Sequence, residues 1–313
     1  MFAMLKALKQ HGVLGINQRN AGLIMRYNER RLFPIVDDKL QTKRLAMQVG
    51  MAIPELYASI ETVHDIKNLA EILKPYDDFA VKPAHGAGGE GILIISGKIK
   101  DFYRQINGNL IKQADLEYHI SNILAGIHSL GGYADTAIIE YCVKIDPTFA
   151  AVSYQGIPDL RIITLRGYPV MAMARLPTHI SGGKANLHQG AVGVGIDLAT
   201  GTTLGGVWYN DPIDYHPDTL KPIDGIQIPC WDDVLMIAAN CYELTGLGYL
   251  GVDIVLDKNY GPLMLESNAR PGLNIQIANR QGLQQRFAQI EKYITQKANA
   301  TDRIALIKKL FKT

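Results

Sequence analysis

The 313-residue sequence has few cysteines, little net charge and no long apolar run. Its three cysteines, Cys142, Cys230 and Cys241, are far apart and lack the spacing of metal ligands or redox pairs. Such scattered thiols are typical of a reducing compartment and argue against a disulfide framework. No apolar stretch reaches the ~20 residues that a membrane-spanning helix needs. These absences predict a cytoplasmic protein without a transmembrane segment.

The charges nearly cancel, with 32 lysines and arginines against 30 acidic residues and a net charge of +2. Because no long basic run is present, nothing in the charge pattern favours a nucleic-acid partner. The chain is 47% hydrophobic and 20% charged, as in an ordinary soluble protein. At this length we expect a large core divided between two compact units.

Apolar periodicity and turn residues predict a series of helices and strands. The C-terminal segment DRIALIKKLFKT forms an amphipathic basic helix that either docks on the core or contacts a membrane surface or a partner. The other expected elements are helices from Asp38 to Gly50 and over 63–74, 112–130 and 229–246, strands at 79–83, 92–96 and 137–143, two strands within DLRIITLRGYPVMAMAR (159–175), a polar glycine-rich loop over 178–195, and the strands GVDIVL and PLMLES around the turn DKNYGP.

The strongest group of candidate site residues lies in that last hairpin. If its turn is centred between Asn259 and Tyr260, Asp253 faces Glu266 directly, with Cβ atoms ~4.5 to 5.5 Å apart. Asn268 lies two residues further on and therefore points to the same face. Two facing carboxylates among apolar residues repel each other, and a hard divalent ion such as Mg²⁺ relieves that repulsion. The alternative, a hairpin face that only meets solvent, is weakened by the apolar flanks.

A glycine-dense loop follows the strand that contains Lys82. Gly86, Gly88, Gly89 and Gly91 allow backbone N–H groups to approach phosphates closely, and the lysine supplies a point charge. A strand and not a helix follows the loop, which excludes a Walker A loop and a Gly-x-Gly-x-x-Gly dinucleotide fingerprint. Taken alone, the segment is equally consistent with a flexible hairpin loop.

Basic residues occur at alternating positions on the next pair of strands. Asp159 and Arg161 share one strand face, and Arg175 ends the following strand, so both guanidiniums are candidates to bind carboxylate or phosphate oxygens. The alternative is a structural ion pair between Asp159 and one of these arginines. His188, in NLHQG, is a candidate substrate contact or proton carrier, although a lone histidine in a polar loop is more often neither.

Read in order over roughly residues 37–290, these segments resemble the ATP-grasp superfamily and in particular the RimK-like alpha-L-glutamate ligases. The resemblance implies an α+β (α/β) ATP-grasp fold, in which two α+β subdomains clamp ATP. It implies an N-terminal/lid subdomain at 37–142 and a catalytic C-terminal subdomain at 143–292. A short segment, 1–36, stands where these ligases commonly have a full N-terminal domain, and a helix at 293–313 ends the chain.

The resemblance also assigns roles to individual residues. Arg161, Arg175 and Lys82 would be catalytic, and Asp253, Glu266 and Asn268 would bind the metal. Asp159, Asn186, His188 and Arg270 would contact substrate. The nucleotide would be held by Lys39, Lys82, the loop residues His85, Gly86, Gly88 and Gly89, the hinge residues Glu140, Tyr141, Cys142 and Val143, and Asp146 as the nearest candidate for a ribose-binding acid.

The implied reaction joins a carboxylate to an amine through an acyl-phosphate and releases ADP and phosphate. The cofactors would be ATP and Mg²⁺, with Mn²⁺ able to substitute, and the partners would be small-molecule or peptide carboxylates and amines. A homo-oligomer is left open. The alternatives are a phosphotransferase or a ligase with a hydroxyl or thiol acceptor, and a regulator that binds ATP without turnover.

Overall fold

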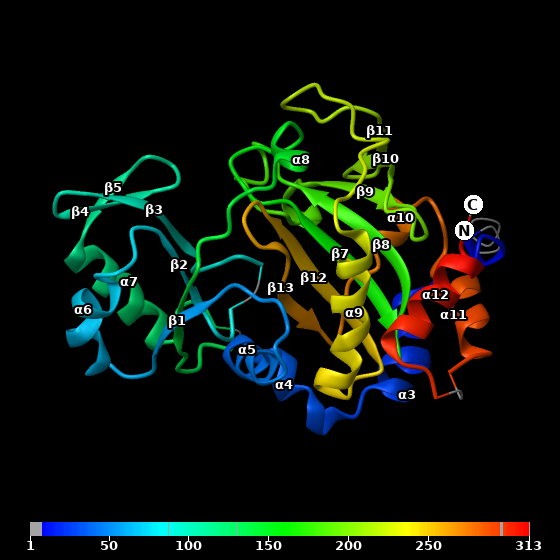
Figure 1. The fold of residues 1–313 in the computed structure, drawn as a ribbon, viewed down its shortest axis with the longest axis horizontal. Coiled ribbons are helices and arrows are strands. Elements are labelled where there is room, and N and C mark those ends of the chain that lie inside the picture. Colours follow the sequence, from blue (N-terminus) through cyan, green and yellow to red (C-terminus); the bar gives the residue numbers. More distant parts are fainter. Residues whose placement is uncertain (1–7, 87, 130, 295–296, 313) are drawn as a thin grey trace. The chain divides into compact units, whose positions relative to one another are not determined.

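A computed structural model describes residues 8–86, 88–129, 131–294 and 297–312. The chain divides into two compact units (Figure 1). The smaller unit comprises Asp37–Met47 and Ile53–Val143, and the larger unit comprises Met1–Val36, Gln48–Ala52 and Lys144–Thr313. Each unit is described by itself below.

The smaller unit is built on an antiparallel six-stranded sheet with the order β1-β6-β2-β3-β4-β5. Successive side chains of a strand point to opposite faces. Accordingly, Ile139 packs with residues of α6 and α7, whereas Ile138 packs with Leu40 of α5. Helices therefore cover both faces of this sheet. Its elements are α5 (Lys39–Gln48), β1 (Leu56–Ile60), η3 (Asp65–Asn68), α6 (Leu69–Leu73), β2 (Phe79–Pro83), β3 (Leu93–Ile99), β4 (Phe102–Gln105), β5 (Leu110–Lys112), α7 (Gln113–Leu124) and β6 (Ala137–Glu140).

The larger unit is built on an antiparallel seven-stranded sheet with the order β11-β10-β9-β8-β7-β12-β13. The long helix α9 packs against four of these strands, β7, β8, β12 and β13. The strands are β7 (Asp159–Leu165), β8 (Tyr168–Leu176), β9 (Val192–Ile196), β10 (Thr203–Trp208), β11 (Asp211–Ile213), β12 (Tyr249–Asp257) and β13 (Gly261–Asn268). The helices are α2 (Ile16–Arg19), η1 (Asn20–Ile24), α3 (Met25–Tyr27), η2 (Arg30–Leu32), α4 (Pro34–Asp37), α8 (Pro147–Ala150), η4 (Leu187–Gln189), α9 (Trp231–Thr245), α10 (Ile275–Ala278), α11 (Leu283–Glu291) and α12 (Ala300–Leu310).

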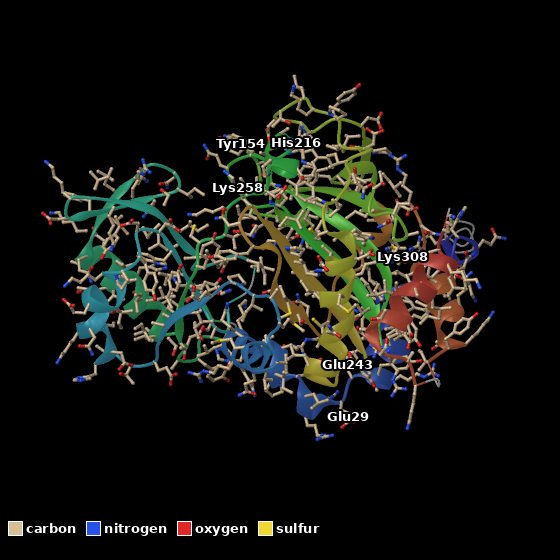
Figure 2. The ribbon with its side chains drawn as sticks, in the orientation of Figure 1. Glu29, Tyr154, His216, Glu243, Lys258 and Lys308 are labelled. Atoms are coloured by element: carbon tan, nitrogen blue, oxygen red, sulfur yellow. The ribbon has the colours of Figure 1, made fainter. Side chains whose placement is uncertain are left out.

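The C-terminal helix docks on the core of the larger unit. Ile304 and Ile307 of α12 are buried, and the helix packs on α9 and β8. Arg303 pairs with Glu243, and Lys308 pairs with Asp232, so two ion pairs connect α12 to α9. Figure 2 labels Glu243 on α9 and Lys308 on α12. Of the alternatives that the sequence leaves open for this helix, the structure shows docking on the core. Within the part of the chain that the structure describes, no helix combines the length and apolarity needed to cross a bilayer.

Several predicted elements differ in extent from the observed ones. The helix expected over 112–130 ends at Leu124, because Gly126 turns the chain with a φ of +80°. The strand expected over 137–143 ends at Glu140. The loop expected over 178–195 was wrong at its end, where Val192–Ile196 form β9. Glycine is needed at position 195 of this strand because a Cβ there would come within 2.8 Å of the Ala278 oxygen in α10.

Candidate functional site

The β12–β13 hairpin brings together the three predicted metal ligands. Asp253 pairs with Glu266, as predicted. Near the turn, however, Asp257 pairs with Gly261, which centres the turn on Asn259, half a residue earlier than assumed. One extra residue in β13 forms a bulge next to Asp253 and restores the expected register. The assumed turn was therefore wrong, although the pairing derived from it is correct.

The side chains in this hairpin converge on one face of the sheet. Asn268 Nδ2 donates to Glu266 Oε1 at 3.2 Å and to Asp253 Oδ2 at 3.5 Å. Asp253 is buried and only 2% exposed, whereas Glu266 is partly exposed. Two carboxylates and one amide therefore lie within reach of a single small ligand.

Two arginines on neighbouring strands hold the buried carboxylate of Asp253. Arg161 lies opposite Asp253 across β7 and β12 and donates from Nε and Nη2, the latter at 2.6 Å. Arg175 Nη2 lies 2.8 Å from Asp253 Oδ2 and also pairs with Asp159, which lies opposite it across β7 and β8. The structural ion pair between Asp159 and Arg175 is thus present. Both predicted catalytic arginines belong to the same network.

The charges of this network do not cancel. Its three carboxylates, Asp159, Asp253 and Glu266, face two guanidiniums, which leaves one negative charge when all are ionised. Burial opposes the ionised form of Asp253, but Arg161 and Arg175 outweigh it and lower its pKa. Burial raises the pKa of Asp159 to about 6, even though Arg175 pairs with it. Of Asp159 and Asp253, Asp159 is therefore the first to take up a proton as pH falls.

The chemistry of these donors suits a hard divalent cation. Carboxylate and amide oxygens are preferred by Mg²⁺, which usually takes its remaining ligands from water and phosphate oxygens. Among the described residues, no group of three or more His, Cys, Asp or Glu side chains forms a complete metal site. Asp253 is already held by both arginines, while the carboxylate of Glu266 is partly exposed. The hairpin thus offers a partial set of ligands, as expected for an ion that also binds a phosphate.

In the smaller unit, Lys82 belongs to a buried three-residue ion cluster. Its Nζ lies 2.7 Å from Glu140 Oε1, and Lys43 Nζ lies 2.8 Å from Glu140 Oε2. All three side chains are at most 10% exposed. Burial would raise the pKa of Glu140, but Lys82 and Lys43 outweigh it and lower that pKa. Two ammonium groups against one carboxylate leave a positive charge at this place, which suits a phosphate-binding lysine.

Lys43 was missed by the sequence analysis, although a signal for it was present. It lies four residues after Lys39 in α5, a spacing that places two side chains on one helix face. Lys39 Nζ donates to the backbone oxygen of Gly86, and the Lys39 amide donates to Ala84 O at 3.0 Å. Helix α5 therefore directs one lysine to the glycine-dense loop and another to Glu140.

Hydrogen bonds with side chains hold both ends of the glycine-dense loop. His85 Nδ1 lies 2.7 Å from Asp135 Oδ1, and the Asp135 carboxylate also accepts from the His85 amide. At the other end, His119 Nε2 lies 3.0 Å from Gly91 O. Gly91 has a φ of +73°, and a Cβ there would come within 2.6 Å of a histidine ring atom, so glycine is required. Like Gly91, the loop residues Gly88 and Gly89 have positive φ angles.

The predicted hinge and ribose contacts have partners of their own. The Tyr141 amide donates to Glu55 O at 2.8 Å, and Cys142 is buried. Val143 is the last residue of the smaller unit. In the larger unit, Asp146 caps α8 by accepting a backbone hydrogen bond at 2.8 Å. Their nucleotide contacts stay predictions.

Apart from Asp159, the predicted substrate residues of the larger unit lie outside its strands. Asn186 Oδ1 accepts from the His188 amide at 3.0 Å and caps η4, while the His188 side chain is exposed. Arg270 follows β13, and its guanidinium lies 4.8 Å from the centre of the Phe33 ring. Contacts of these three side chains with substrate also stay predictions.

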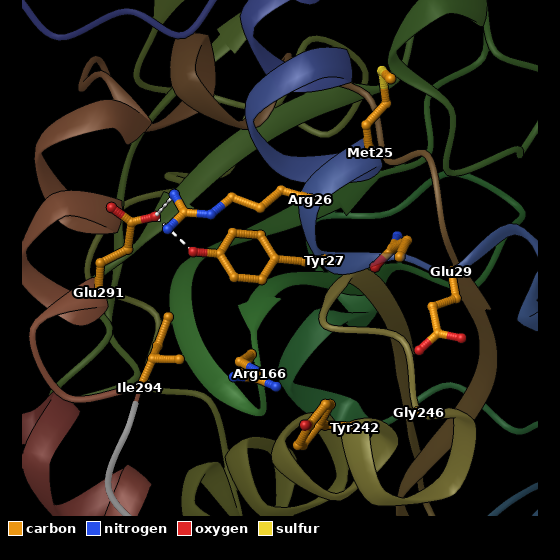
Figure 3. A pocket seen from close by; sticks show the side chains of 10 residues that line it. Met25, Arg26, Tyr27, Glu29, Arg166, Tyr242, Gly246, Glu291 and Ile294 are labelled. Atoms are coloured by element: carbon orange, nitrogen blue, oxygen red, sulfur yellow. Dashed lines mark hydrogen bonds and ion pairs between the residues drawn. The ribbon is translucent and has the colours of Figure 1, made fainter.

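A pocket of about 540 Å³ in the larger unit contains none of the predicted site residues. Figure 3 shows Arg26 and Tyr27 of α3 reaching Glu291, with nitrogen-to-oxygen and oxygen-to-oxygen distances of 2.9 and 2.7 Å. Burial, and to a smaller extent the hydrogen bond with Glu291, raises the pKa of Tyr27 to about 12. Half of the residues that line the pocket belong to the N-terminal segment, and the others come from distant parts of the chain, among them Arg166, Tyr242 and Glu291. The sequence did not predict that these segments lie together.

Comparison with protein families gives one match. A family described as sugar-transfer associated ATP-grasp matches residues 18–292. No curated protein matches the sequence.

Several solved structures are similar in fold at low sequence identity. The ATP-grasp ligase PsnB complexed with a minimal precursor is 16% identical, with a TM-score of 0.47 over 86% of this chain and 63% of that one. A Chryseobacterium gregarium RiPP-associated ATP-grasp ligase, in complex with ADP and a leader and core peptide, is 13% identical, with a TM-score of 0.46 over 88% and 65%. The D-alanine–D-alanine ligase of Bacillus anthracis complexed with ATP is 14% identical, with a TM-score of 0.44 over 89% and 68%. The chain spans less than two thirds of the first two proteins.

Proposed function

The chain belongs to the sugar-transfer associated ATP-grasp family, and from that membership we propose that it is an ATP-dependent ligase joining a carboxylate to an amine through an acyl-phosphate. The observation that carries the proposal is the network around Asp253. Two carboxylates and an amide of the β12–β13 hairpin lie beside the guanidiniums of Arg161 and Arg175. Groups that bind a divalent cation and groups that bind phosphoryl oxygens thus share one sheet face.

The nucleotide is proposed to be bound by cationic and backbone groups of the smaller unit. Lys39 and Lys82 would contact its phosphates, together with N–H groups of the loop after His85. The charge of the cluster around Glu140 supports this role, because two buried ammonium groups share one carboxylate. Backbone groups of 140–143 would contact adenine.

In the proposed reaction, an oxygen of the substrate carboxylate attacks the γ-phosphorus of ATP, and ADP leaves. An amine then attacks the acyl carbon, phosphate leaves, and the amine loses a proton. Asp253, Glu266 and Asn268 would hold Mg²⁺, which neutralises phosphate charge when bound. Arg161 and Arg175 would orient the carboxylate and stabilise charge on the transferred phosphoryl group.

Oxygen labelling tests this proposal. The protein is incubated with MgATP and a panel of carboxylic acids and amines, and ADP release identifies active pairs. If the acid carries ¹⁸O in its carboxylate, an acyl-phosphate route delivers one ¹⁸O to the phosphate that is released. ADP release without ¹⁸O in phosphate would contradict the ligase mechanism and favour a phosphotransferase. A hydroxyl-containing acceptor, such as a sugar, is included because the family is associated with sugar transfer.

Matched variants connect the activity to the site. Glu266→Ala removes a proposed metal ligand and should abolish ADP release. Glu29→Ala removes an exposed carboxylate that pairs with Arg31 in the same unit, and it should leave the rate unchanged. Tight ATP binding without ADP release from any acid–amine pair would instead support a regulator without turnover.

A further inference from the structure

The N-terminal segment, residues 8–36, is fastened to the end of the β12–β13 hairpin. The buried side chain of Asn28 donates to Tyr249 O at 2.8 Å and to Ala269 O at 3.0 Å, and it accepts from the Tyr249 amide at 2.7 Å. One side chain thereby bridges the start of β12 and the residues that follow β13. The position of the N-terminal segment relative to the hairpin is therefore fixed by specific hydrogen bonds.

This segment carries Arg19 to the same loop. Arg19 Nη1 donates to Pro271 O at 3.0 Å, and its Nη2 donates to Asn20 Oδ1 at 2.8 Å. Both acceptors are uncharged. Among the described residues, no carboxylate lies within ion-pair distance of Arg19, in contrast to Arg161. The guanidinium of Arg19 therefore has no ion-pair partner in the part of the larger unit that the structure describes.

Pro271 connects Arg19 to the proposed active site. A Cβ on Gly251 would come within 2.6 Å of Pro271 Cβ and 3.2 Å of Arg161 Cδ. Gly251 pairs with Asn268 and lies two residues before Asp253. Pro271 and Arg161 thus both pack against this glycine, with Arg19 bound to the carbonyl of Pro271.

The environment of Tyr249 supports this proximity. Its phenol oxygen is buried and has no hydrogen-bond partner among the described residues. Burial raises the pKa of Tyr249, and the charges of Arg19 and Arg161 both act against that rise. Both guanidiniums therefore lie near the same buried ring.

We propose that Arg19 binds a second anionic group of the acid substrate, while Arg161 and Arg175 face the carboxylate that reacts. This inference rests on the proposed ligase function and specifies its substrate class as an acid with two negative groups. A guanidinium fork suits a carboxylate or a phosphate bidentately, and Arg19 is a partly buried arginine that has no ion-pair partner among the described residues. The N-terminal segment would thus supply a specificity-determining residue.

Pairs of acids that differ only in the second group test the proposal. ADP release is measured with succinate against succinamate, L-glutamate against L-glutamine, and 3-phosphoglycerate against glycerate. In at least one pair, the wild type should prefer the acid that has two anionic groups. Arg19→Ala should lower kcat/KM for that acid roughly tenfold or more and leave kcat/KM for its partner with one anionic group unchanged, since one charge-assisted contact is lost. The carboxylate and phosphate pairs distinguish the two chemical sources of the second charge.

Controls separate a recognition defect from a folding defect. Arg31→Ala, in the same segment, removes an exposed arginine that pairs with Glu29 and should change neither rate. Arg19→Lys should retain part of the preference, because the charge stays and the fork is lost. The proposal would be overturned if Arg19→Ala kept the wild-type preference within a pair. It would also be overturned if the wild type turned over both members of every pair at equal rates.

Failure of the ligase function itself gives a different result. If no acid stimulates ADP release by the wild type, the proposed reaction is contradicted, and calorimetric titration of the same acids tests Arg19 directly. Dianion binding that Arg19→Ala weakens about tenfold would support the anion site. Absent binding, or equal binding to both proteins, would overturn it.

Discussion

Arg161 lies directly opposite Asp253 across β7 and β12, and its guanidinium donates to both oxygens of that buried carboxylate. The two residues are 92 positions apart in the sequence. Because Asp253 also meets Arg175, its negative charge is shared by arginines on β7, the neighbouring strand, and on β8, the next strand in the sheet order. Stability and the proposed chemistry thus depend on the same ion pair.

Replacing Arg161 with alanine should destabilise the larger unit as well as inactivate the protein. The change leaves a buried carboxylate with one guanidinium, and losing one partner of a buried pair costs about 3 kcal/mol or more. The free energy of unfolding, from denaturant titration, measures the loss. The double variant Arg161→Met with Asp253→Leu removes both charges and should recover much of the stability but none of the activity. Equal stability of the single and double variants would refute the coupling.

The raised pKa of Asp159 gives a pH dependence with a definite sign. A folded-state pKa of about 6, above the ordinary aspartate value of 3.8, means that folding favours the protonated acid. Its contribution is fully present below pH ~4 and is lost as pH rises through about 6. Asp159→Asn should remove this component, on the order of 2 kcal/mol between pH 4 and 7.

Unfolding free energies measured at several pH values between 4 and 7.5 check this expectation. Asp211→Asn, at an exposed position of β11, is the matched control and should follow the wild-type curve. If the unfolding free energy of Asp159→Asn followed a pH curve parallel to that of the wild type, Asp159 would be ionised in the folded protein over this whole pH range.

The fold was predictable where apolar runs and turn residues agree. The strand Phe79–Pro83 has the predicted bounds. Asp253 pairs with Glu266 as predicted, because in a short hairpin the position of the turn nearly determines which residues face each other. Membership of the ATP-grasp superfamily, inferred from the order of motifs, is confirmed by the family match. The RimK-like relationship, and with it a glutamate substrate, stays a prediction.

Other features depend on contacts between distant segments. Nothing local in AVGVGI indicates that its glycines allow a strand to lie against α10, so the segment was predicted to be a loop. The ion pairs of Asp253 require the strand order β8-β7-β12, which local periodicity does not specify. The position of Arg19 likewise requires knowing where the N-terminal segment packs.

Replacing Lys43 with methionine should make the smaller unit more sensitive to acid. Lys43 and Lys82 hold the pKa of Glu140 below its ordinary value, so the ionised acid contributes stability above its unfolded pKa. That contribution is lost as pH falls through the lower, folded pKa. Without Lys43 the folded pKa rises, and the loss begins at a higher pH. Burial also lowers the pKa of Lys43, so removing its buried charge offsets part of the cost.

Acid unfolding from pH 7 to 3 measures this change. Lys74→Met is the control, since Lys74 forms an exposed ion pair with Glu71 and contributes little. An unchanged acid midpoint in Lys43→Met would mean that Lys82 alone keeps Glu140 ionised.

A Cβ at Gly195 should disturb the packing of β9 on α10, whereas one at Gly205 should not. At position 195 the added carbon would lie 2.8 Å from Ala278 O and 3.0 Å from an α-carbon, and backbone atoms cannot rotate away. Gly195→Ala should therefore destabilise by about 1–3 kcal/mol. At Gly205, in β10, the nearest atom is a guanidinium nitrogen 3.5 Å away, so Gly205→Ala should be neutral or slightly stabilising. Denaturant midpoints compare the two variants, and equal midpoints would show that α10 moves freely from the strand.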